Sequence, residues 1–157
     1  HTLEKQSLQV KLNLQATCSA EGNVQQLQQV FVNLVINAAN ATQGAGDILI
    51  RSHDWYDNHE LKGVVVDVED YGRGIAEGIL PHIFDPFFTT RDNGTGLGLS
   101  VSYGIIRRYG GDIQVQSEQG QGSIFSVYLL QQARYNDNDQ ATAEQLLATL
   151  SEAQRKW

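Results

Sequence analysis

The chain has 157 residues, and its 18 acidic side chains outnumber 11 basic ones, so that its formal net charge is −7 with neutral histidines. This balance argues against sequence-independent binding of DNA or RNA, because phosphate backbones attract basic surfaces. Apolar residues make up 41% of the chain, which is enough for one ordinary core, and no run approaches the roughly 18 apolar residues of a membrane span. We therefore expect one globular domain with a short appendage.

Residues 7–15 open the chain with a strictly alternating pattern, which predicts a half-buried β-strand. The apolar positions, which point one way, are Leu8, Val10, Leu12 and Leu14. Residues 23–41 have the 3.6-residue spacing of an amphipathic helix, with Asn23 as N-cap and Gln26 completing a capping box. The expected apolar face of this helix comprises Val24, Leu27, Phe31, Leu34, Val35 and Ala38.

The remaining elements extend the alternation of strands and helices. We expect strands at 47–56 and 63–69 around a polar turn at 57–60, and a final hairpin of strands near 112–117 and 123–130. Between them lie a glycine-rich loop at 70–74, a helical turn near 76–80, an irregular segment over 85–97 and a helix over 97–109. This order predicts an α/β fold, a two-layer α+β sandwich with the helices on one face of a mixed sheet.

The chain divides into a domain over 1–133 and a tail over 134–157. The tail begins as a polar linker, and its apolar spacing then predicts a short amphipathic helix. Two interpretations of that helix stay open. It packs on its own domain, or it leads toward another domain.

Five amides share one face of the first predicted helix, within roughly 80° of one another at about 100° per residue. They are Gln26, Gln29, Asn33, Asn37 and Asn40. Such a stripe is either a solvated face or the lining of a polar cavity, since buried amides need partners. A neutral amide oxygen suits a hard cation such as Mg²⁺ that is already bound to phosphates.

Three further motifs follow the third predicted strand. Asp70-Tyr71-Gly72-Arg73-Gly74 places a carboxylate at a strand end beside two glycines, where it can accept a hydrogen bond from an exocyclic amine. The phenylalanines of 83–90 are expected to anchor a loop onto the core. Gly94-Thr95-Gly96-Leu97-Gly98-Leu99 opens the second helix, where backbone amides can meet phosphate. Each motif alone also suits an ordinary turn or loop.

In order and spacing together, these motifs resemble the GHKL, or Bergerat, ATP-binding fold shared by histidine kinases, gyrase-type topoisomerases, Hsp90 and MutL. Residues 33–38 match the N box, 70–74 the G1 box, 84–90 the F box and 94–99 the G2 box, and Gly122-Ser123-Ile124-Phe125 fits the closing hairpin. The likeness spans roughly residues 5–131. The run Phe87-Phe88-Thr89-Thr90 and the short lid are most similar to those of sensor histidine kinases of the nitrogen-regulator type.

The resemblance implies roles for particular residues of an ATP and Mg²⁺ site. Asn37 is the expected Mg²⁺ ligand, and Asn33 is an expected neighbour of the phosphates or the metal. The resemblance implies that both are catalytic residues. Asp70 is expected to bond the adenine amino group. The other expected nucleotide-binding residues are Asn40, Gly72, Gly74, Ile75, Phe88, Thr89, Thr90, Arg91, Gly94, Thr95, Gly96, Leu97, Gly98 and Leu99. Asn40 departs from the charged residue of many relatives, so its role stays open.

Asn33 bears on whether ATP is hydrolysed. ATP-hydrolysing relatives carry a glutamate there as general base, and an amide has no useful basicity. The resemblance therefore implies a histidine autokinase rather than a hydrolase. A nucleotide-binding module without phosphotransfer is the alternative.

The expected phosphoacceptor lies outside this chain. His59-Glu60-Leu61-Lys62 imitates an acceptor motif, but it falls in the turn between two predicted strands. The resemblance implies two partners, an upstream dimerisation domain that carries the acceptor histidine and a response regulator receiver domain. We expect no nucleic acid or membrane contact, a monomeric isolated domain and a cytoplasmic location.

Overall fold

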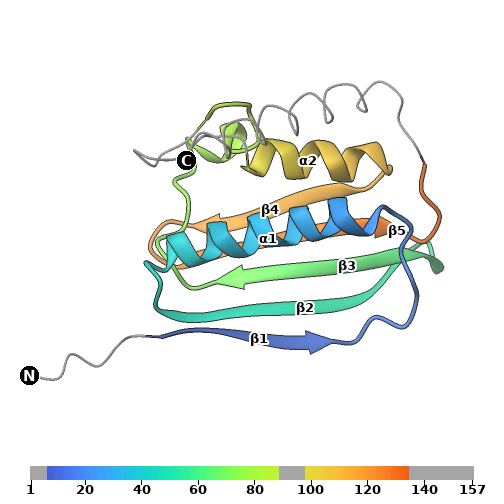
Figure 1. The fold of residues 1–157 in the computed structure, drawn as a ribbon, viewed down its shortest axis with the longest axis horizontal. Helices are drawn as coiled ribbons and strands as arrows, with labels where there is room; N and C mark the ends of the chain where they lie inside the picture. The colour runs from blue at the N-terminus through green and yellow to red at the C-terminus, as the bar shows by residue number, and fades with distance from the viewer. Residues whose placement is uncertain (1–6, 89–97, 135–157) are drawn as a thin grey trace, which may run out of the picture.

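The computed structural model describes residues 7–88 and 98–134. These residues form a five-stranded sheet with both α-helices on one of its faces, as Figure 1 shows. The predicted two-layer arrangement is confirmed. No helix in the described part of the chain is long and apolar enough to cross a membrane.

The sheet has the order β1-β2-β3-β5-β4. Its first two strands run parallel, and all other neighbours are antiparallel, so the sheet is mixed as expected. The strands are β1 (Leu8–Leu14), β2 (Gly46–Asp57), β3 (Glu60–Asp70), β4 (Asp112–Glu118) and β5 (Gly122–Leu130). Asn58 and His59 join β2 to β3 with positive φ angles of 47° and 63°, which the tight turn of a two-residue hairpin requires. The predicted turn is confirmed, and His59 is exposed within it.

Helix α1 spans Val24–Ala41, and its start was predicted correctly in part. The side chain of Asn23 caps the helix, because its Oδ1 accepts a hydrogen bond from the Gln26 backbone N–H at 3.0 Å. The second hydrogen bond of the predicted capping box, from the Asn23 backbone N–H to the Gln26 side chain, does not form, because the Asn23 N–H donates to the Tyr109 hydroxyl. The side-chain Oε1 of Gln26 instead accepts a hydrogen bond from the Tyr109 hydroxyl, just beyond the end of the second helix.

Helix α2 spans Gly98–Arg108, and the short 3₁₀ helix η1 spans Leu80–His82. The helical turn expected near 76–80 is present, since the N–H groups of Ile79 and Leu80 both donate to the Ala76 carbonyl. It leads directly into η1.

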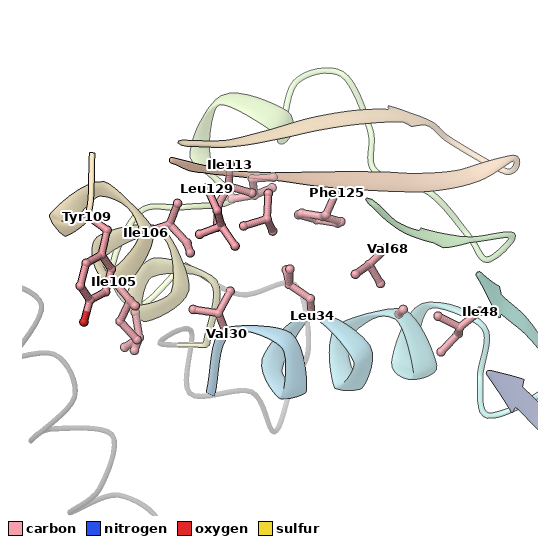
Figure 2. Close-up of a cluster of buried hydrophobic side chains, with 14 residues drawn as sticks. Val30, Leu34, Ile48, Val68, Ile105, Ile106, Tyr109, Ile113, Phe125 and Leu129 are labelled. Atoms are coloured by element: carbon pink, nitrogen blue, oxygen red, sulfur yellow. The ribbon is translucent and has the colours of Figure 1, made fainter. Parts of the chain in front are cut away.

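The core lies between the two helices and the sheet, as Figure 2 shows. Val30, Leu34 and Ala38 contribute to it from α1, and Phe125 is its largest fully buried side chain. Val24, expected on the apolar face of α1, is 68% exposed, so that prediction is wrong. By the helical repeat, Val24 lies on the side of α1 opposite Asn33, which contacts α2, and no described element covers that flank.

Strand β1 forms as predicted, but its expected half-burial is wrong. Val10, Leu12 and Leu14 are 48%, 65% and 62% exposed. They lie on the helix-bearing face, since Val10 pairs with the buried Ile48 and Leu12 with Ile50. Figure 1 shows the reason, which is that β1 forms the edge of the sheet beyond the area that α1 covers.

Candidate functional site

Asp70 ends β3 on the helix-bearing face and is only 2% exposed. Its Oδ1 accepts a hydrogen bond from the Gly72 backbone N–H at 2.9 Å. Burial raises the pKa of this carboxyl above its ordinary value, and hydrogen bonds from the backbone N–H groups of Gly72 and Ser123 oppose that rise. A buried, perturbed carboxylate at a strand end is a candidate ligand-binding group.

Residues 70–74 form a loop that we call the Asp70 loop, and its two glycines let it approach the rest of the fold closely. A Cβ at Gly72 would lie 2.3 Å from the Ala41 carbonyl oxygen at the end of α1. At Gly74, where φ is +67°, it would lie 2.0 Å from the Glu118 carbonyl oxygen. The loop is held there by hydrogen bonds from the N–H of Arg73 to Ala41 O (3.1 Å) and from the N–H of Gly120 to Arg73 O (2.6 Å). Close packing of protein backbone therefore accounts for both glycines.

The amide stripe of α1 separates into two parts. Its N-terminal part binds α2, because the Asn33 side-chain Nδ2 donates to Gly98 O at 3.2 Å and Ser102 Oγ at 3.3 Å. Asn33 Oδ1 accepts from Gln29 Nε2 at 3.1 Å, and Ser102 Oγ also donates to Gly98 O at 2.9 Å. These four residues, Gln29, Asn33, Gly98 and Ser102, form a polar seam that fixes the first turn of α2 against α1.

The C-terminal part of the stripe comprises Asn37 and Asn40. Asn37 is half-buried and Asn40 exposed, and neither side chain has a hydrogen-bond partner among the described residues. Asn37 follows Asn33 by one turn, so it lies on the α2-facing flank, toward the end of α1 that contacts the Asp70 loop. Its amide is therefore available to a ligand, whereas that of Asn33 is occupied.

We expect that Asn33→Ala lowers the free energy of unfolding by about 1–2 kcal/mol, since it removes two donated hydrogen bonds from a partly buried seam. Ser102→Ala should couple to it by about 0.5–1 kcal/mol in a double-mutant cycle followed by urea denaturation. Asn40→Ala is the matched control from the same helix and should have little effect. Additive effects of Asn33→Ala and Ser102→Ala would contradict the seam.

The predicted phenylalanine anchor depends on one residue. Phe84 stacks on Tyr103 of α2 with ring centroids 4.9 Å apart and meets Phe125 edge-on at 6.5 Å. Phe88 is half-buried and lies 5.9 Å from the His82 ring. Phe87 is exposed at a positive φ of 64°, so its expected anchoring is wrong.

Several predicted site residues have no described position. Thr89, Thr90, Arg91, Gly94, Thr95, Gly96 and Leu97 lie outside the described residues. Gly98 and Leu99 begin α2, and Leu99 packs against the core together with Ile75, which follows the Asp70 loop. The structure thus brings Asn37, Asp70, Gly72 and Gly74 to one end of the molecule.

Sequence reasoning missed three serines that support this site. Ser102 belongs to the polar seam, and Ser117 accepts from the Ile75 N–H at 2.8 Å while its Oγ lies 2.7 Å from Ser123 Oγ. Ser123 pairs with Asp70 across β3 and β5. The position of Ser117 could have been predicted from the sequence. It follows Ile113 and Val115 at every second residue of β4, so its hydroxyl lies on the core-facing side of the strand.

A hollow of about 330 Å³ lies at the ends of β3, β4 and β5. Glu69, Asp70, Gln116, Ser117 and Ser123 contribute to its lining, but no amide of α1 does. Glu69 and Gln116 belong to the sheet face away from the helices, so this hollow extends to that face, and Asp70 is the residue that it shares with the candidate site.

Comparison with known proteins supports the resemblance. A family model described as histidine kinase-, DNA gyrase B-, and HSP90-like ATPase matches residues 22–133. The chain is 40% identical over 134 residues to the sensor kinase CckA of Brucella abortus, a match that covers 76% of this chain and 14% of that protein. It is 43% identical over 103 residues to the sensor histidine kinase ZraS of Escherichia coli, covering 66% of this chain and 21% of ZraS.

Solved structures agree with these matches. The nucleotide-free catalytic domain of histidine kinase ThkA superposes with a TM-score of 0.65 at 34% identity, covering 78% of this chain and 80% of that one. Full-length ShkA in complex with AMPPNP gives a TM-score of 0.69 at 25% identity, covering 83% of this chain and 27% of ShkA. This chain belongs to the family of histidine kinase-, DNA gyrase B- and HSP90-like ATPases, as an ATP-binding catalytic domain of the sensor histidine kinase type.

Proposed function

We propose that this domain holds Mg²⁺-ATP between Asn37 of α1 and the Asp70 loop, and that it presents the γ-phosphate to a histidine on a separate domain. The observation that carries the proposal is the pairing of a half-buried amide without a hydrogen-bond partner among the described residues with a buried carboxylate at the same end of the fold. A neutral amide suits a hard cation, and a carboxylate suits an exocyclic amine.

The residues present fit this cofactor pair. Asn37 would contribute an amide oxygen to Mg²⁺, whose charge would neutralise the phosphates. Asp70 would accept a hydrogen bond from the adenine amino group, since the Gly72 N–H fixes the orientation of its carboxylate. Gly72 and Gly74 would hold the loop close to α1 and to the β4–β5 turn. Asn40, Ile75 and Phe88, together with residues 89–99, would complete the nucleotide contacts.

Phosphoryl transfer to water is disfavoured by Asn33. Its amide has no basicity, and both its nitrogen and its oxygen are engaged in the polar seam. We therefore assign Asn33 a positioning role through α2, in place of direct contact with phosphates. Catalysis would depend on alignment of the γ-phosphate with an imidazole from the partner.

The curated relatives indicate a larger parent protein. This chain spans between 14% and 25% of their lengths. We infer that its partners are an upstream dimerisation domain bearing the acceptor histidine and a response regulator receiver domain, and that it acts in the cytoplasm. Membership of the nitrogen-regulator subtype stays a prediction.

A phosphorylation assay tests the proposal. ATP labelled at the γ-phosphate should label the histidine-bearing domain of the parent kinase when this chain is added, and this chain alone should acquire little label. If neither protein is labelled while nucleotide still binds, the alternative of a binding module without phosphotransfer is correct.

His59→Gln should leave this labelling unchanged, because His59 lies exposed in the β2–β3 turn rather than on a helix. The same assay with the variant measures this. A loss of label in His59→Gln would contradict the interpretation of this turn as an ordinary exposed connection.

A further inference from the structure

Three side chains form a row across the sheet at the candidate site. Asp70 of β3 pairs with Ser123 of β5, and Ser123 pairs with Ser117 of β4, so the three lie side by side on the helix-bearing face. Strand β5 lies between β3 and β4, as Figure 1 shows. Asp70 and Ser123 are buried, and Ser117 is half-buried. A change at Ser117 can therefore reach Asp70 through a single intervening residue.

The Ser117 hydroxyl uses its full hydrogen-bonding capacity, which is one donor and two acceptor sites. Its Oγ donates to the Gly122 carbonyl oxygen at 3.0 Å and accepts from the Ile75 N–H at 2.8 Å. The remaining acceptor site meets Ser123 Oγ at 2.7 Å, so Ser123 is the donor of that bond. This hydroxyl thus connects the end of β4 to the start of β5 and to the chain that follows the Asp70 loop.

One of these bonds acts on the peptide group that binds Asp70. The Gly122 carbonyl and the Ser123 N–H belong to one planar peptide, so a bond that fixes the carbonyl also fixes the direction of the N–H. That N–H donates to the Asp70 carboxylate, as does the Gly72 N–H at 2.9 Å. Hydrogen bonds in such a chain polarise and strengthen one another. Ser117 therefore supports Asp70 through the peptide between them.

The bond to Ile75 supports the other donor. Ile75 directly follows the Asp70 loop, and the Ser117 hydroxyl holds its N–H. The loop contains Gly72, whose N–H is the second donor to the Asp70 carboxylate. Both N–H groups that orient this carboxylate are thus tied to Ser117, one through the shared peptide and one through the end of the loop.

We propose that Ser117 is a positioning residue for base recognition, which holds the Asp70 carboxylate in the orientation that selects a purine with an exocyclic amino group over one with a carbonyl in its place. This role rests on the proposed function, in which Asp70 accepts a hydrogen bond from the adenine amino group. A purine carbonyl has no hydrogen to donate to the carboxylate. A serine that only stabilised the β4–β5 turn would affect the binding of both purines equally.

Calorimetric titration of the full chain with ADP and with IDP, each in the presence of Mg²⁺, tests this role. IDP has a carbonyl oxygen where ADP has the amino group, so the ratio of the two Kd values measures the contact with Asp70. We expect the unmodified chain to prefer ADP by about tenfold or more, and Ser117→Ala to lower that preference by about threefold or more. The Kd for IDP should change by less than about twofold, because IDP does not use this contact.

Ser126→Ala is the matched control. Ser126 Oγ donates to Asp67 Oδ1 at 2.6 Å, also between β5 and β3 but on the face away from the helices. The substitution removes a serine–carboxylate bond without touching the row, so the ratio should stay at its original value. Ser117→Cys is a second test variant, because a thiol nearly keeps the shape and is a weaker donor and acceptor. It should also lower the ratio, whether or not the alanine variant folds.

A preference for ADP that the Ser117 variants retain would overturn this role of Ser117 and leave the proposed function standing. An equal weakening of ADP and IDP binding in Ser117→Ala would overturn it as well, because it would indicate a purely structural serine. If the unmodified chain itself has no preference for ADP, the Asp70 contact of the proposed function is contradicted, and the role of Ser117 fails with it.

Discussion

Asp70→Asn should weaken nucleotide binding by roughly 10- to 100-fold, the loss expected when a hydrogen bond to a charged acceptor is removed. The amide oxygen of asparagine can still accept the Gly72 N–H, so the loop should keep its conformation. Calorimetric titration with a non-hydrolysable ATP analogue measures the change in Kd. A Kd within twofold of the parent value would remove Asp70 from the site.

The same variant has a predictable pH signature. Burial raises the folded-state pKa of Asp70, so between its ordinary value of 3.8 and the raised one the folded protein binds more protons than the unfolded chain. This carboxyl therefore lowers the free energy of unfolding progressively as pH rises through that window. Asp70→Asn should be at least as stable as the parent at neutral pH, with the difference shrinking toward pH 4. Thermal denaturation across this range checks the sign.

Gly72→Ala should lower the free energy of unfolding by about 3 kcal/mol, at the upper end of overpacking effects. Its new Cβ would lie 2.3 Å from the Ala41 carbonyl oxygen and 2.9 Å from the Thr42 nitrogen, and backbone atoms cannot move aside as a flexible side chain can. The strain also falls on the Arg73-to-Ala41 hydrogen bond that holds the loop. Urea denaturation measures the loss.

Gly78→Ala is the matched control for this prediction. It lies further along the same connection, and nothing lies within 4 Å of its added Cβ. We expect its stability to stay within about 0.5 kcal/mol of the parent. Equal effects of the two substitutions would show that the Asp70 loop does not pack tightly against α1.

Local patterns predicted the elements well, because strand alternation and helical spacing are properties of short segments. Asn23 was identified as an N-cap from its position alone, and its hydrogen bond to Gln26 involves only neighbouring residues. The prediction that amides share one face of α1 was likewise correct. Which of those amides meet protein and which remain for a ligand depends on α2, which lies far along the chain from Asn33.

Burial could not be predicted from pattern in the same way. Alternation in β1 shows that its apolar side chains share a face, but not whether a helix covers that face. Phe87 and Phe84 are both phenylalanines of one loop, yet Phe84 packs against the core, whereas Phe87 is 66% exposed. Gly72 was expected to bind the nucleotide, whereas its close contact with Ala41 depends on how the Asp70 loop and α1 meet in the folded chain.

Titration calorimetry of this chain with a non-hydrolysable ATP analogue, with and without Mg²⁺, tests the central claim most directly. We predict Mg²⁺-dependent binding that Asn37→Ala weakens by about tenfold or more, as expected for a lost metal or phosphate contact. Gln28→Ala, at an exposed position of the same helix outside the amide stripe, should leave it unchanged. Binding that ignores both Mg²⁺ and Asn37→Ala would contradict a metal-nucleotide site at the end of α1.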